Sequence, residues 1–174
     1  MKIRDAQPED FSELRTFYIR LNEVINIRNN NLNPDNPPYP SDELIRGAVA
    51  KQEQLVGVED GQIVAACIVN NECQDAYTKA NWRVPAGKDE FWVLHALRIA
   101  PEYEGRGFAK QMLSHIIDRA KERGIKAIRL DILEDYSVQR LYYRFGFQYI
   151  ETVDLLYEDI GYPKRFKLLE KEIV

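Results

Sequence analysis

The sequence predicts an α/β fold, and the evidence lies in three features of residues 90–132. An apolar strand at 90–99 runs through a proline-marked turn to two closely spaced glycines, Gly105 and Gly107. An amphipathic helix follows directly, and a second strand at 128–132 comes after it. Strand, glycine turn, helix and strand form a βαβ unit, whose ligand loop lies at the end of the first strand.

The segments before this unit predict a strand, two helices and a hairpin. Residues 2–6 form a short strand, and a helix opens at Pro8 with apolar residues at helical spacing. Residues 28–40 hold five Asn and four Pro, which predicts a loop. A second helix starts at Ser41, because two acidic residues follow this capping residue in the first turn.

Two apolar runs, 54–59 and 62–70, predict a hairpin that turns at Asp60-Gly61. A polar segment then leads to the strand at 90–99. The helix that follows the glycines has an apolar face at helical spacing and stops at Gly124. That face consists of Phe108, Met112, Leu113, Ile116, Ile117 and Ala120. The later elements are a strand at 128–132, a short helix within 135–147 that is closed by Gly146, and strands near 147–156 and 164–172.

Length and composition predict one domain over residues 1–174, with the hydrophobic and charged fractions (45% and 30%) of an ordinary globular protein. We see no signal peptide and no apolar run long enough to span a bilayer, and we expect a cytoplasmic protein without a membrane partner. The net charge of −4 argues against nucleic acid and suits a cationic substrate. The two cysteines, Cys67 and Cys73, are expected to be free thiols, and with only two histidines no metal site is expected.

The glycine loop is a candidate site for a pyrophosphate. A helix N-terminus leaves backbone N–H groups unpaired and attracts anions, and glycines let a phosphate approach the backbone. An ordinary turn would also use paired glycines. A dinucleotide-binding fingerprint would need a third glycine at Lys110, and a Walker A loop would need Gly-Lys-Ser/Thr, so these two phosphate motifs are excluded.

A second block, residues 135–147, lies downstream, and together the two blocks resemble the GNAT superfamily of acetyl-CoA-dependent N-acetyltransferases. The positions of the family's first motif, Gln/Arg-x-x-Gly-x-Gly/Ala, fall on Glu104, Gly107 and Ala109. Its second motif, Asn-x-x-Ala-x-x-Leu-Tyr followed after three residues by Gly-Phe, falls on Asp135, Val138, Leu141, Tyr142, Gly146 and Phe147. Glu104 departs from the usual Gln or Arg. Asp135 replaces the usual Asn, which touches the pantetheine arm in the family.

The resemblance implies a GNAT fold, with a mixed central sheet of about six to seven strands flanked by about four helices, in which two central parallel strands splay apart. It implies an N-acetyltransferase that uses acetyl-CoA as co-substrate. The acetyl group would move to a primary amine of a small molecule or peptide, by direct attack in a ternary complex. The acceptor would meet the loops at 28–40 and 71–89, where Tyr39, Tyr77 and Trp82 either line the pocket or pack in the core.

The resemblance also assigns residues to the cofactor. Backbone N–H groups of Leu97, Arg98 and Ile99 would meet the thioester carbonyl, where preorganised donors act strongly. Asp135 would lie at the pantetheine arm. The diphosphate would be met by the amides of Glu104, Gly105, Arg106, Gly107, Phe108, Ala109 and Lys110. The side chains of Arg106 and Lys110 either add positive charge there or are simply solvated.

His95 is the candidate base, acting directly or through a water, and Tyr142 is the candidate acid for the leaving thiolate. An alkylamine with a pKa near ~10.4 costs about 4.6 kcal/mol to present neutral at pH 7, so a positioned base is needed. Strand alternation places Val93, His95 and Leu97 on one side. The alternative for His95 is a histidine that simply packs in the core, and Glu90 is a rival base. The alternative for Tyr142 is a tyrosine that simply packs in the core.

Two other functions stay open on the sequence. A non-catalytic acyl-CoA-binding regulatory module of the same fold is compatible with the departures at Glu104 and Asp135. A nucleotide-binding βαβ protein is disfavoured because the Walker lysine and the third glycine are missing. The sequence leaves a homodimer open and does not identify the acceptor amine.

Overall fold

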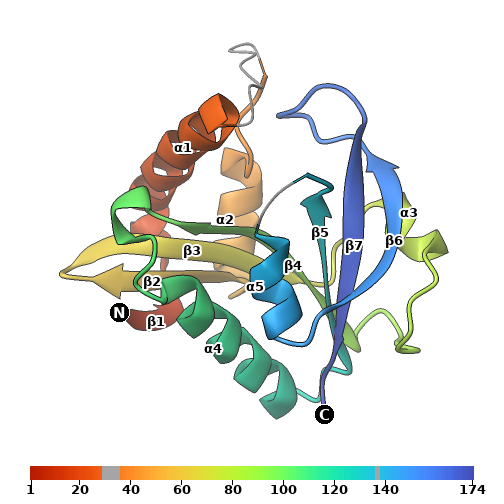
Figure 1. Cartoon of the computed structure of the whole chain (residues 1–174). Helices are drawn as coiled ribbons and strands as arrows, with labels where there is room; N and C mark the ends of the chain where they lie inside the picture. The colour runs from red at the N-terminus through yellow and green to blue at the C-terminus, as the bar shows by residue number, and fades with distance from the viewer. Residues whose placement is uncertain (29–35, 136–137) are drawn as a thin grey trace. The chain divides into compact units, whose positions relative to one another are not determined.

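The computed structural model describes residues 1–28, 36–135 and 138–174. Its elements follow the predicted order, with one additional helix, α3 (Figure 1). The strands are β1 (Lys2–Asp5), β2 (Gln54–Glu59), β3 (Gln62–Asn70), β4 (Phe91–Ile99), β5 (Ala127–Leu133), β6 (Gln148–Leu155) and β7 (Lys164–Glu172). The helices are α1 (Phe11–Arg28), α2 (Asp42–Ala50), α3 (Asp75–Lys79), α4 (Phe108–Glu122) and α5 (Gln139–Arg144), and two short 3-10 turns are η1 (Pro8–Asp10) and η2 (Pro101–Tyr103).

The seven described strands form one mixed sheet in the order β1-β2-β3-β4-β5-β7-β6, which confirms the predicted fold class. By backbone proximity the chain divides into two units. The first unit is Met1–Val69, His95–Met112 and Tyr157–Tyr162, and the second is Asn70–Leu94, Leu113–Leu156 and Pro163–Val174. Strand β4 and helix α4 each contribute to both units. A single domain over residues 1–174 stays a prediction.

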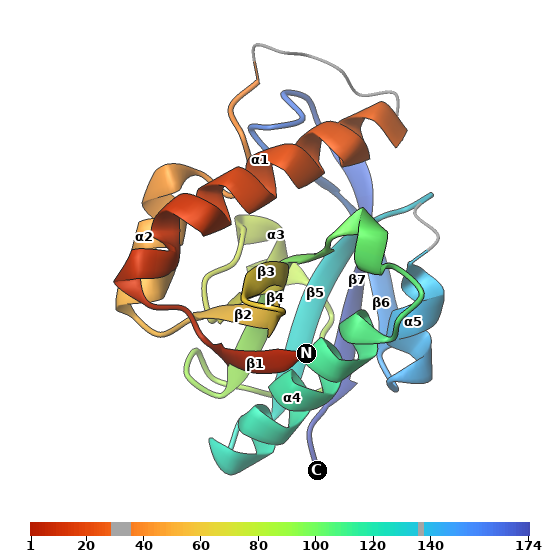
Figure 2. The same ribbon diagram turned by 90° about the vertical axis from the view of Figure 1, so that its left-hand side faces the viewer.

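In the first unit, α1 and α2 lie on the same side of the antiparallel strands β1, β2 and β3 (Figure 2). Ser41 caps α2 as predicted, because its hydroxyl accepts a hydrogen bond from the Leu44 N–H at 3.2 Å. The hairpin turns at Asp60 and Gly61, both of which have a positive φ. The shared core buries Leu14, Phe17, Tyr18, Leu21, Ile45, Val49, Val56, Ile63 and Ala66.

An ion pair holds the start of the first unit. Arg4 donates to both carboxylate oxygens of Asp10, at 2.6 and 2.9 Å, and the Gln7 N–H donates to the same carboxylate at 2.7 Å. The hydrogen bond from Arg4, followed by that from the Gln7 backbone, holds the pKa of Asp10 below its usual value.

We expect Asp10→Asn to lower the free energy of unfolding by about 1 kcal/mol at pH 7, after allowance for the partial exposure of the pair. The folded-state pKa of Asp10 lies below its unfolded-state value. Its stabilisation is therefore present above the unfolded-state pKa and is lost as the pH falls through the folded-state pKa. Urea unfolding measures the gap in free energy of unfolding between wild type and Asp10→Asn. This gap should be smaller at pH 3 than at pH 7. A gap that is equal at both pH values would contradict this role.

In the second unit, β5 lies between β4 and β7. It pairs in parallel with β4 over three residue pairs, from Phe91↔Ala127 to Val93↔Arg129, and antiparallel with β7 along its whole length. Strand β7 also pairs antiparallel with β6, and Figure 1 shows β5, β7 and β6 side by side. The parallel ladder is thus short, and β4 continues beyond it into the first unit.

A buried ion pair fixes the irregular segment before β4. Arg129 Nε lies 3.0 Å from Glu170 Oε1, and the guanidinium sits 4.4 Å from the ring centre of Trp82. The N–H groups of Arg83 and Val84 donate to the other oxygen of Glu170, at 2.9 and 3.0 Å. Breaking such a pair would leave a buried charge uncompensated. The hydrogen bonds from Arg83 and Val84 to Glu170 therefore fix the path of the segment before β4 in this unit.

Candidate active site

The loop between β4 and α4 belongs to the first unit and has the geometry of an anion site. After η2, Gly105 and Gly107 adopt φ values of +77° and +82°, which residues with a Cβ seldom adopt. A Cβ built on either glycine would meet no atom within 4 Å. The backbone at both glycines therefore faces open space among the described residues, and the conformation, rather than crowding by protein atoms, requires glycine.

Five of the seven amides predicted to face a diphosphate have no acceptor in the described part of the chain. The Glu104 N–H donates to the Pro101 carbonyl at 3.1 Å, and the Arg106 N–H donates to the Tyr103 carbonyl at 3.4 Å. The first α-helical hydrogen bond of α4 is from Gln111 to Gly107, at 3.1 Å. The remaining amides, which donate to no group in residues 1–28, 36–135 and 138–174, are those of Gly105, Gly107, Phe108, Ala109 and Lys110. The amides of Glu104 and Arg106, which were predicted to bind a diphosphate, are thus used in hydrogen bonds within the protein's own turns.

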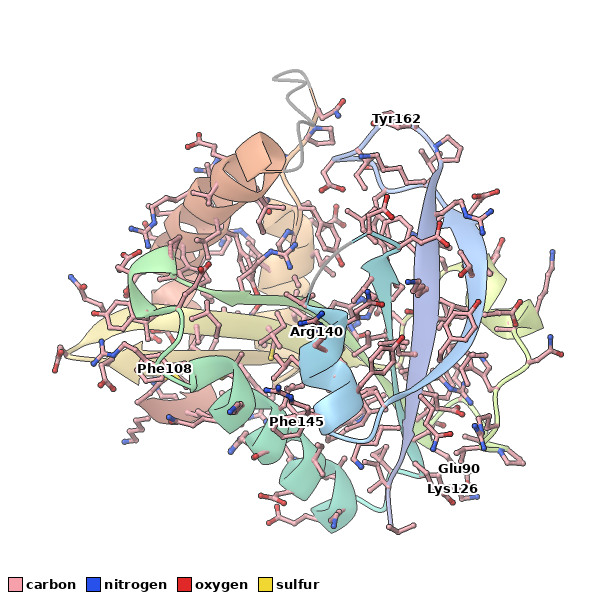
Figure 3. The ribbon with its side chains drawn as sticks, viewed as in Figure 1. Glu90, Phe108, Lys126, Arg140, Phe145 and Tyr162 are labelled. Carbon is pink, nitrogen blue, oxygen red and sulfur yellow. The ribbon has the colours of Figure 1, made fainter. Side chains whose placement is uncertain are left out.

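The loop carries two exposed cationic side chains, Arg106 and Lys110, and the exposed carboxylate of Glu104. The Arg106 guanidinium lies 4.9 Å from the ring centre of Tyr103 and 5.3 Å from that of Phe108, and these two rings stack 5.7 Å apart. Phe108 is labelled at the start of α4 in Figure 3. Contact with both rings restricts where the Arg106 charge can lie, and keeps it beside the helix N-terminus.

The alternation predicted along β4 is interrupted at Ala96. Ala96 has a φ of +49° in the middle of the strand, and both Val93 and Leu94 are buried. A positive φ interrupts the pleat, so the side of the strand that a residue faces after Ala96 cannot be counted from Val93. Leu97, Arg98 and Ile99 follow this irregularity and are each half-buried.

His95 directly precedes that irregular residue and is half-buried in the first unit. Its rival Glu90 lies in the second unit, where its carboxylate is 2.7 Å from Lys126 Nζ and accepts from the Gly87 N–H at 2.8 Å. Figure 3 shows Glu90 and Lys126 next to each other. Lys126 first, and then the Gly87 amide, lower the pKa of Glu90, which makes this exposed carboxylate a poor base.

Tyr142 and Asp135 belong to the second unit. Tyr142 is 7% exposed on α5, and its ring contacts that of Phe147 edge-on at 5.6 Å. Gly146 closes the helix as predicted, with φ of +83°, while the Phe147 N–H donates to the Tyr142 carbonyl at 3.1 Å. Asp135 lies exposed in the turn before α5, and the motif positions 136 and 137 lie outside the described residues. His95 and Tyr142 therefore belong to different units.

Of the three aromatic residues expected either near the acceptor or in the core, Tyr77 and Trp82 pack against each other in the second unit. The rings of Tyr77 and Trp82 lie 5.3 Å apart, and the Trp82 indole donates to the Tyr77 carbonyl at 2.7 Å. The Tyr77 hydroxyl is 2.6 Å from a carboxylate oxygen of Asp131. These contacts give both residues a structural role.

Sequence reasoning did not single out Asp159, in the loop between β6 and β7, or the side chain of Arg98. Each carries a buried polar atom without a hydrogen-bond partner in the described part of the chain. No motif or periodicity marks this pair, because the two residues are 61 positions apart. The described residues contain no group of three or more His, Cys, Asp or Glu that could hold a metal ion. None of their helices is long and apolar enough to cross a membrane.

A model of the acetyltransferase (GNAT) family matches residues 21–147. The ribosomal protein bS18-alanine N-acetyltransferase of Haemophilus influenzae is 29% identical over 94 residues, which are 54% of this chain and 53% of the relative. This chain therefore aligns with only about half the length of that curated relative. Two solved structures share the fold. The ribosomal-protein-alanine N-acetyltransferase of Brucella melitensis has a TM-score of 0.71 at 18% identity, covering 99% of both chains. The structure of yncA from Salmonella typhimurium with its cofactor acetyl-CoA has a TM-score of 0.67 at 16% identity, covering 100% of this chain and 94% of that one.

Proposed function

The chain belongs to the acetyltransferase (GNAT) family, and we propose that it transfers an acetyl group from acetyl-CoA to a primary amine. The proposal rests on the five amides from Gly105 to Lys110 that have no acceptor among the described residues. They lie at the N-terminus of a 15-residue helix, beside two glycines that face open space. Such an N-terminus stabilises negative charge, and a diphosphate carries that charge. The yncA structure with acetyl-CoA supports the same co-substrate for this chain.

The residues of the first unit fit the diphosphate part of acetyl-CoA. Amides of residues 105 and 107–110 would hold the diphosphate, and Arg106 and Lys110 would add positive charge. When bound, the co-substrate would supply the reactive thioester. Backbone N–H groups of residues 97–99 would bind the carbonyl oxygen and stabilise the negative charge that develops on it.

Two side chains would manage protons in this proposal. His95 would accept a proton from the attacking amine, directly or through a water, because the amine must be neutral to react. Tyr142 would donate a proton to the departing sulfur. The relative from Haemophilus influenzae supports an amine on a peptide or protein as acceptor, and a small-molecule amine is the second class to test.

Thermal unfolding with added acetyl-CoA, followed by a thiol-release assay over a panel of amines, tests the function. We expect acetyl-CoA to raise the melting temperature by mass action, and at least one amine to release the thiol of CoA. Binding without thiol release for any amine would favour the regulatory module. No thermal shift with acetyl-CoA would overturn the proposal.

Tyr142→Phe tests the acid. We expect kcat to fall at least about 10-fold while the Kd for acetyl-CoA changes less than about 2-fold, because only the proton donor is removed. Tyr143→Phe is the matched control, since its side chain is the neighbouring tyrosine on α5 and is 41% exposed. Steady-state rates and direct binding measure both effects. Equal turnover by wild type and Tyr142→Phe would remove Tyr142 from the mechanism.

A further inference from the structure

Arg98 and Asp159 in the first unit carry complementary polar atoms without partners. Arg98 Nε is buried and donates to nothing, and Asp159 Oδ1 is buried and accepts from nothing, in the described part of the chain. The Nη1 atom of Arg98 does donate, at 3.1 Å, to the carbonyl of Leu97 in its own strand. A buried polar atom without a partner is costly, so a donor and an acceptor that both stay unpaired in one unit call for a ligand that completes them.

The two side chains are near enough to interact electrostatically but do not bond to each other. Burial raises the pKa of Asp159, and the charge of Arg98 acts in the opposite direction. Nevertheless, no hydrogen bond or ion pair joins these residues within the ranges that the structure describes. A charged pair that stabilises a fold closes to direct contact, whereas each of these two side chains keeps one buried polar atom without a partner.

The backbone of Asp159 is held in place from the α1–α2 side. The side-chain amide of Asn36 donates to the Asp159 carbonyl at 2.8 Å. The rings of Tyr39 and Tyr157 meet edge-on at 5.5 Å, and the side-chain amide of Asn22 donates to the Tyr39 carbonyl. All of these residues belong to the same unit. The backbone that carries this carboxylate is therefore held in place before any ligand binds, as a recognition group requires.

We propose that Arg98 and Asp159 select an acceptor that carries an amino group close to a carbonyl or carboxylate oxygen, as an amino acid or a peptide N-terminus does. Asp159 Oδ1 accepts a hydrogen bond from the amine N–H, and Arg98 Nε–H donates to the acceptor's oxygen. A simple diamine satisfies the carboxylate but leaves the guanidinium unpaired. The inference rests on the proposed function and narrows its acceptor class.

The test compares an alanyl peptide with putrescine as acceptors, for Asp159→Asn and Arg98→Gln. We expect Arg98→Gln to raise KM for the peptide at least about 10-fold and KM for putrescine less than about 2-fold. Asp159→Asn should raise KM for both amines. Glu158→Gln is the matched control, because it removes an exposed carboxylate one residue away and should change neither KM. Equal effects of Arg98→Gln on both amines, or no effect on either, would overturn the inference.

Calorimetric binding of the alanyl peptide alone separates this inference from the proposed function. Wild type should bind the peptide, and both Arg98→Gln and Asp159→Asn should lose most of that affinity. If acetyl-CoA neither binds nor reacts, the proposed function fails, and this binding result still decides the role of the pair. Lower melting temperatures with unchanged peptide affinity would assign Arg98 and Asp159 a purely structural role and would contradict the inference.

Discussion

Gly107→Val is expected to weaken acetyl-CoA binding at least about 10-fold. Gly107 has a φ of +82°, and a β-branched residue in this left-handed region is strained by at least about 1–2 kcal/mol. The strain would be relieved by rotating the backbone, which would turn the amides of residues 107–110 away from a shared anion. The added side chain would also occupy the open space that we assign to the diphosphate. Calorimetry with acetyl-CoA measures the change in Kd.

Gly61→Val provides the matched control. Gly61 lies in the same unit and has a φ of +78°. A Cβ built on Gly61 would also meet no atom within 4 Å. The two variants should therefore lose similar amounts of stability in urea unfolding. Only Gly107→Val should lose acetyl-CoA affinity. If both variants bind acetyl-CoA as wild type does, the loop does not hold the diphosphate.

His95→Ala is expected to lower kcat/KM by about 100-fold, which is the lower end of what a positioned base contributes. In wild type the rate should fall as the pH is lowered, because a protonated imidazole cannot accept the proton of the amine. The variant should lack that acid limb. A pH–rate profile at saturating acetyl-CoA measures both features.

The matched control for this experiment is His115→Ala on α4, the other histidine of the chain. It should leave the rate and the acid limb in place, since the proposal gives His115 no role. An unchanged rate and profile in His95→Ala would remove His95 from the mechanism. The amine would then lose its proton to another group or to solvent.

The regular elements could be predicted from the sequence because their patterns are local. The bounds of β2 and β3, the cap at Ser41 and the close of α5 at Gly146 depend on a few neighbouring residues, and the structure confirms them. Helix α3 was missed because five residues show little periodicity. Its Tyr77 is buried by contacts with residues far along the chain, which no local pattern reveals.

The candidate site was only partly predictable. The glycine motif identifies the loop, but which amides are used internally depends on turns at Pro101 and Tyr103 that the motif does not encode. Counting along β4 failed at Ala96, because its positive φ carries no sequence signature when the residue is not glycine. Pairings such as Glu90 with Lys126 form between separate elements and become visible only in three dimensions.

Amide chemical shifts of Gly105, Gly107, Phe108, Ala109 and Lys110, followed by NMR during titration, test the central claim most directly. We expect CoA to shift all five amide signals strongly, and pantetheine, which lacks the diphosphate, to leave them nearly unchanged. Amides of Gly61 and Gly124 serve as internal references, because both glycines also have a positive φ but lie outside the loop. Shifts of similar size with CoA and pantetheine, or none with either, would contradict diphosphate binding by this loop.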